Sequence, residues 1–66
     1  MKYEFTVEDL ELVESQIGFG WIDFPILAYR FWHKLPYSVT PATSDVEDFI
    51  IDFMSQYNQK VRANTF

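Results

Sequence analysis

The chain has 66 residues, no cysteine, one histidine and two glycines. Without cysteine there can be no disulfide framework and no thiolate zinc site. A lone His33 cannot supply a His-rich metal site, so we expect neither a metal nor a cofactor. Small domains usually compensate for a small core with disulfides, a metal or oligomerisation. Aromatic packing and self-association are the two means that remain.

Positive charge and long apolar runs are also scarce. Five Lys and Arg stand against ten Asp and Glu, a formal net charge of -5. Phosphate backbones repel such a chain, so we expect no direct nucleic-acid binding. The apolar run at 24–29 is about six residues long, whereas a membrane span needs about 20. The opening segment has no apolar signal-peptide core. With the lack of cysteine, these features favour a cytoplasmic protein that does not enter a membrane.

Apolar residues are nevertheless abundant. Hydrophobic side chains make up 48% of the chain and Phe, Trp and Tyr make up 20%, too much for a disordered protein. The length predicts one domain over residues 1–66. A domain of this size buries only about 60% of the surface that its unfolded chain exposes, so its stability is marginal.

Two helices are predicted near the ends of the chain. Thr6 and Asp9 have the spacing of a capping box, and Gly18 or Gly20 ends the helix that follows. A second capping box over 44–47, with Ser44 as the cap and Glu47 reaching back, predicts the start of the last helix. Its apolar residues fall within an arc of about 140° at the helical period. They are Val46, Phe49, Ile50, Phe53, Met54, Tyr57 and Val61.

A middle helix is predicted between Asp23 and Pro36, with Pro25 in its first turn. Apolar and polar residues alternate over 1–7, a strand-like pattern whose nearest candidate partner is 19–24. We therefore expect a mostly α fold, a small three-helix domain with an optional short N-terminal β-strand or two-stranded element.

The middle helix is apolar on two sides. One arc of about 140° holds its larger stripe, and a second stripe of Ile26, Tyr29 and His33 lies almost opposite. The larger stripe comprises Phe24, Leu27, Ala28, Phe31, Trp32 and Leu35. Either the helix is sandwiched, or Tyr3 and Phe5 fold back over the second stripe, or that stripe is a partner surface. Aromatic side chains dominate interface hot spots, so we predict a partner-binding patch at Trp21, Ile26, Tyr29, Trp32 and His33.

No group of residues predicts catalysis. His33 has serines in the chain to act with, but no nucleophile elbow, oxyanion motif or glycine-rich loop accompanies it. The Gly18–Gly20 pair lacks the third glycine of a dinucleotide fingerprint. We expect no enzyme activity.

The acidic residues form two groups, neither with the spacing of a calcium loop. We predict an acidic surface made of Glu8, Asp9, Glu11, Asp45, Glu47, Asp48 and Asp52. The sequence thus predicts a small acidic binding or regulatory protein that acts through an aromatic patch, on itself as a homodimer or on a foreign protein. The alternative is an acidic mimic of nucleic acid that blocks a DNA- or RNA-binding protein, as an accessory protein of a phage would.

Overall fold

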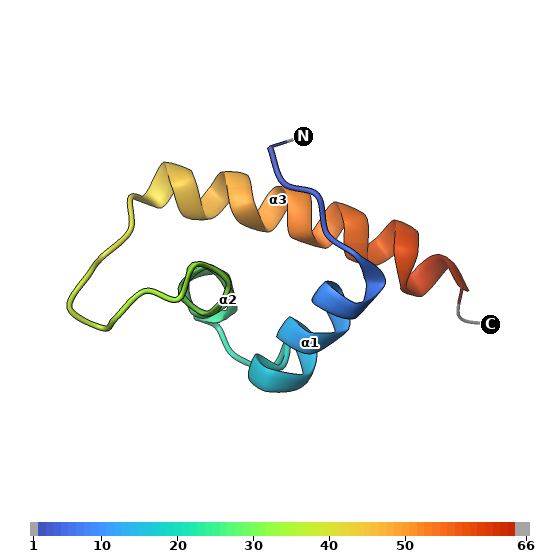
Figure 1. Ribbon diagram of the computed structural model, residues 1–66, viewed down its shortest axis with the longest axis horizontal. Helices are drawn as coiled ribbons and strands as arrows, with labels where there is room; N and C mark the ends of the chain where they lie inside the picture. The colour runs from blue at the N-terminus through green and yellow to red at the C-terminus, as the bar shows by residue number, and fades with distance from the viewer. Residues whose placement is uncertain (1, 65–66) are drawn as a thin grey trace.

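The computed structural model describes residues 2–64 and is built of three α-helices. They are α1 (Val7–Ile17), α2 (Phe24–His33) and α3 (Thr43–Lys60), followed by the short 3-10 helix η1 (Arg62–Asn64). In Figure 1, α3 runs along the top of the molecule, with α1 and α2 beneath it. The predicted mostly α, three-helix fold is confirmed. No helix in the described part of the chain is long and apolar enough to cross a membrane.

α1 begins and ends as its sequence predicts. The Thr6 hydroxyl accepts a hydrogen bond from the Asp9 backbone N–H at 3.1 Å, and the Asp9 carboxylate accepts one from the Thr6 N–H at 3.1 Å. At the other end, Gly18 has φ 81°, a conformation that glycine adopts without steric cost. Its backbone N–H donates to the Glu14 carbonyl.

The other helix ends differ from expectation. α3 begins at Thr43 with Ala42 as its cap and has no side-chain capping bond, so the predicted capping box at Ser44 and Glu47 is wrong. Asp23 does precede α2, again without a side-chain bond, and Pro25 lies in the first turn. α2 ends at His33, where Lys34 takes a left-handed backbone conformation with φ 56° and ψ 45°.

The optional N-terminal strand is also wrong, because no residue in 2–64 is assigned to a strand. Residues 2–6 instead form an extended N-terminal arm that packs on α3 and is held by side chains of that helix. The Asp52 carboxylate accepts hydrogen bonds from the backbone N–H groups of Lys2 and Tyr3, at 2.8 and 3.0 Å. Gln56 accepts from the Phe5 N–H at 2.8 Å and donates to the Tyr3 carbonyl at 2.7 Å.

The core lies where the arm and the three helices meet. Its buried cluster comprises Phe5, Leu10, Val13, Phe24, Ala28, Phe49 and Phe53. Phe5 is 1% exposed and contacts Trp32, Phe49 and Phe53 edge to face, with ring centroids 4.9–5.6 Å apart. The predicted inner face of α3 is confirmed. Val46, Phe49 and Phe53 are buried, and the other four residues of that stripe are half-buried.

Candidate functional site

An apolar groove opens between α1 and the C-terminal half of α2. Its volume is about 750 Å³. α1 contributes Leu12 and Ile17, and α2 with the segment after it contributes Leu27, Phe31, Leu35 and Tyr37. Three of these side chains are exposed, namely Leu12 at 48%, Phe31 at 38% and Tyr37 at 88%. The groove is larger than two other surface hollows, whose volumes are about 250 and 280 Å³.

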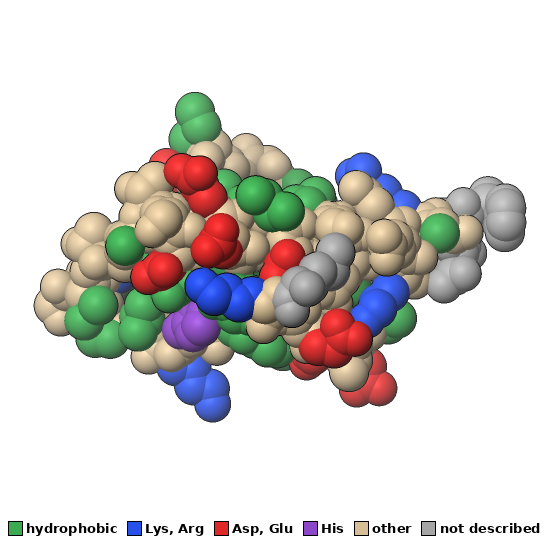
Figure 2. Space-filling view, turned by 90° about the horizontal axis from the view of Figure 1, so that it is seen from above, with side chains coloured by type: hydrophobic (Ala, Val, Ile, Leu, Met, Phe, Trp, Pro, Cys, Tyr) green, Lys and Arg blue, Asp and Glu red, His purple; other side chains and the backbone are tan. Residues whose placement is uncertain are grey.

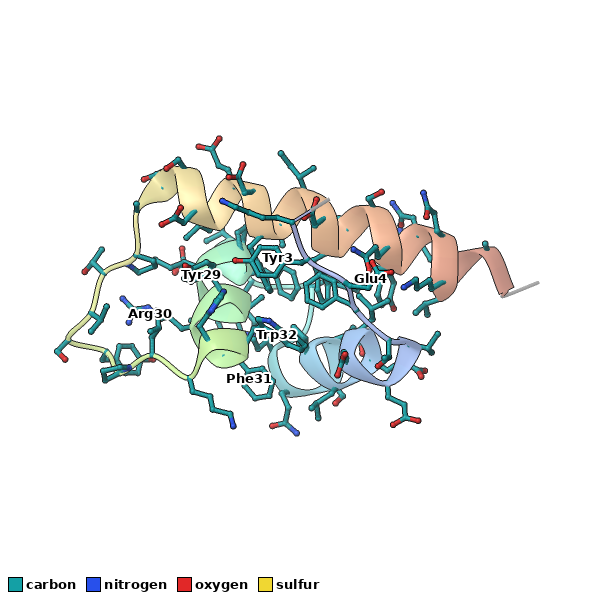
Figure 3. All side chains as sticks on the ribbon, turned by 45° about the horizontal axis from the view of Figure 1, so that its top comes forward. Tyr3, Glu4, Tyr29, Arg30, Phe31 and Trp32 are labelled. Atoms are coloured by element: carbon teal, nitrogen blue, oxygen red, sulfur yellow. The ribbon has the colours of Figure 1, made fainter. Side chains whose placement is uncertain are left out.

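Trp32 connects this groove to the core. Its side chain lines the groove and also meets the buried Phe5 ring at 4.9 Å. In Figure 3, Phe31 lies at the lower end of α2 beside α1, while Trp32 points inward beneath the arm. Through Trp32, the wall of the groove is therefore continuous with the buried core.

Two basic residues stand at the α2 side of the groove. Arg30 donates to the Pro36 carbonyl at 2.9 Å, and its guanidinium lies 5.5 Å from the centre of the Tyr37 ring. These contacts hold the exposed Tyr37 against the helix. Lys34 also lines the groove, from a backbone conformation that residues with a Cβ rarely adopt.

The arm contacts part of the second stripe of α2 through Tyr3, while His33 stays exposed and Ile26 lies in a separate hollow. Tyr29 is half-buried and meets Phe49 edge to face at 5.6 Å. His33 lies 4.2 Å from the Tyr29 ring, and its Nε2 is hydrogen bonded to the Tyr3 hydroxyl at 3.0 Å. Figure 3 shows Tyr3 on the same side of α2 as Tyr29. Partial burial raises the pKa of the Tyr3 hydroxyl above its usual 10.0, and nearby Tyr29 adds to the effect.

The five residues predicted to bind a partner are thus spread over three places. Tyr29 and His33 lie beside Tyr3 of the arm, and Trp32 lines the groove. Trp21 is 65% exposed in the connection between α1 and α2. Ile26 lines a separate hollow of about 280 Å³ with Ile22, which is 95% exposed.

Most of the groove was not predicted as a site. Leu27, Phe31 and Leu35 were assigned to the core-facing stripe of α2, but there only Phe24 and Ala28 are buried. Leu12 carried a usable signal, because it lies off the apolar stripe of α1 and yet is apolar. Tyr37 carried a second one, as a large aromatic residue within a proline-flanked loop.

The seven residues of the predicted acidic surface lie on two helices, three on α1 and four on α3. Six of them lie at least partly on the surface. Figure 2, which views the molecule from above, shows acidic side chains spread over that face with basic ones among them. Asp52 is instead buried, at 8% exposed, where it binds the arm. Asp48 pairs with the Lys2 ammonium at 3.5 Å. Within residues 2–64 no three acidic or histidine side chains are placed to hold a metal ion.

No family model, curated protein or solved structure matches this chain.

Proposed function

We infer that this chain is a non-catalytic binding or regulatory protein, and that it docks a protein partner in the groove between α1 and α2. The observation that carries this inference is the exposure of Leu12, Phe31 and Tyr37 around one apolar hollow. Large exposed apolar patches on small proteins mark interaction sites. The partner is either another copy of the chain or a foreign protein, and a cysteine-free chain suits the reducing cytoplasm.

The groove offers enough apolar contact to support binding. Fully burying one large apolar side chain contributes about 1.5–3 kcal/mol. Aromatic residues in the centre of an interface contribute most of all, because they bring a large area and few torsions to freeze. Phe31 and Tyr37 both line the groove, and Arg30 lies over the Tyr37 ring.

A second candidate function rests on the exposed acidic side chains of α3; Figure 2 shows acidic side chains on the upper face of the molecule. Asp45, Glu47 and Asp48 are exposed there, and such a surface suits a basic groove that normally holds nucleic acid. The two functions differ in their response to salt. Screening weakens a charge-driven complex steeply, but leaves an apolar one almost unchanged.

The test is affinity capture with matched variants. The immobilised chain is exposed at low and high salt to cell lysate or to a soluble copy of the chain, and the retained proteins are identified by mass spectrometry. Phe31→Glu places a charge in the groove, whereas Ile51→Glu places the same charge at a 63% exposed position on α3. We expect one partner to be retained by the wild type and by Ile51→Glu, and to be lost with Phe31→Glu at both salt concentrations.

Two outcomes would contradict the proposal. Retention of that partner by Phe31→Glu would show that the groove is not the docking site. Loss of the partner at high salt, with no effect of Phe31→Glu, would favour the acidic mimic. Circular dichroism confirms that each variant is folded before the capture is interpreted.

A further inference from the structure

The two edges of the groove carry opposite charges. Arg30, from α2, and Lys34, from the position directly after it, both line the groove. On α1, the helical repeat places the exposed Glu8 about 40° and Glu11 about 100° from the lining residue Leu12, on the side away from Ile17. The α2 side of the groove is therefore basic, and the carboxylates beside Leu12 make the α1 side acidic.

These charges are not neutralised within the molecule. The ion pair found among residues 2–64 joins Lys2 to Asp48, on α3. Within the described chain neither Arg30 nor Lys34 has a carboxylate at salt-bridge distance, and neither Glu8 nor Glu11 has a cation there. Both edges are thus available to charges on a partner.

The backbone conformation of Lys34 is a second observation at the basic edge of the groove. A left-handed conformation costs a residue with a Cβ about 1–2 kcal/mol, and glycine is the usual residue at the end of a helix with this geometry. Strained residues of this kind cluster at functional sites. Here the strained position places a lysine at the rim of the groove.

We propose that the occupant of the groove is a second copy of this chain, related to the first by a two-fold axis that runs along the groove. Such an axis lays α1 of one copy over α2 of the other, so that Glu8 and Glu11 face Lys34 and Arg30 twice in one interface. Two-fold interfaces are self-complementary in this way. A partner helix with charges of one sign would match only one of the two edges. This inference rests on the proposed function, because it takes the groove as the docking site.

The size of the molecule suits a dimer. A stable interface covers about 800 Å² on each partner, which is about one-sixth of the 4658 Å² exposed by this chain. A 66-residue domain without cysteine gains stability most directly by burying further apolar surface against a partner.

The first test is the solution mass of the wild type by light scattering over a concentration series. We expect a species of twice the chain mass of 7.9 kDa, which dissociates on dilution. Phe31→Glu should be monomeric over the same range, and Ile51→Glu should match the wild type. A wild type that stays monomeric at every concentration overturns the inference, as does a dimer that Phe31→Glu leaves intact.

The second test reverses the charges on each edge. The first variant combines Arg30→Glu with Lys34→Glu, and the second combines Glu8→Lys with Glu11→Lys. Each alone should dimerise at least about tenfold more weakly, since every pair across the interface becomes repulsive and occurs twice. Mixing the two should restore the affinity, because all edge pairs are then attractive in the mixed dimer. If each variant alone dimerises like the wild type, or if mixing restores nothing, the arrangement is refuted.

These results also separate the inference from the proposed function. A monomeric wild type that still captures another protein, with loss on Phe31→Glu, refutes the second copy and leaves the docking function standing. A monomeric wild type whose captures do not depend on Phe31 refutes both.

Discussion

Replacing Gln56 by Ala tests how the N-terminal arm is held. Gln56 is 3% exposed and makes two hydrogen bonds to the backbone of the arm, one with the Phe5 N–H and one with the Tyr3 carbonyl. Each such bond contributes about 1 kcal/mol, and a buried donor left without an acceptor costs about 1–3 kcal/mol. We expect Gln56→Ala to lower the free energy of unfolding by about 2–4 kcal/mol.

That loss is large for this molecule. A domain of this length has a total stability of about 3–10 kcal/mol. Because small domains lose about 1 kcal/mol of stability per molar urea, the unfolding midpoint should fall by about 2–4 M. Circular dichroism in a urea series measures the midpoint, and hydrogen exchange by NMR measures the protection of the Phe5 amide, which should fall as well.

Gln59→Ala is the matched control, since Gln59 is exposed on the same helix. We expect it to change the stability by no more than about 0.5 kcal/mol. If Gln56→Ala matched this control and the Phe5 amide kept its protection, the reasoning that Gln56 holds the arm would be refuted.

Three further changes test other parts of the fold. Lys34→Gly should remove the steric strain of the left-handed backbone and raise the melting temperature by about 2–8 °C, after allowance for the greater freedom of glycine in the unfolded chain. Lys34→Ala keeps that strain and is the control. Equal melting temperatures of the two variants would contradict this. Thr6→Ala should lower the free energy of unfolding by about 1 kcal/mol, because the capping hydrogen bond is lost. Urea unfolding measures this, with Thr40→Ala in a loop as the control. The pKa of the Tyr3 hydroxyl is higher in the folded state than in the unfolded chain. The neutral hydroxyl therefore contributes its full stability below the usual pKa of 10.0, and this contribution is lost as the pH rises through the higher pKa of the folded state. Urea midpoints at alkaline pH should therefore fall less steeply in Tyr3→Phe than in the wild type, and parallel curves would show that Tyr3 does not contribute.

The sequence predicts the helices well because their signals are local. Thr6, Asp9 and Gly18 act within one turn of their own helix, and the structure confirms them. The inner face of α3 follows from the 3.6-residue period alone, since an 18-residue helix shows that period clearly. The cap at Ser44 failed because the helix begins two residues earlier, where Ala42 takes the extended conformation of a cap.

The arm shows where local patterns are insufficient. The alternation over 1–7 matches the inward position of Tyr3 and Phe5 and the exposure of Lys2 and Glu4, but the strand that it predicts is wrong. It cannot show what pairs with the backbone. Here the partners are Asp52 and Gln56, four residues apart on one face of α3, and polar residues on a helix usually predict solvent exposure.

The groove escaped prediction for a related reason. The larger stripe of α2 is apolar along its whole length, so periodicity assigns all of it to the core. Figure 1 shows α2 almost end-on beneath α3, so the two helices cross steeply. Only part of the stripe is then covered, and Phe31 is left open. A crossing angle depends on both helices, and the period of one helix does not contain it.

The way the arm is held also sets an order of events during synthesis. Residues 2–5 leave the ribosome before residues 52–60, yet their hydrogen bonds join positions 49–55 residues apart in the chain. Until α3 has been made, Tyr3 and Phe5 have no helix side chains to bind their backbone groups and no Phe49 or Phe53 to pack against. A segment that is translated before α3 is therefore among the last parts of this fold to reach its final place.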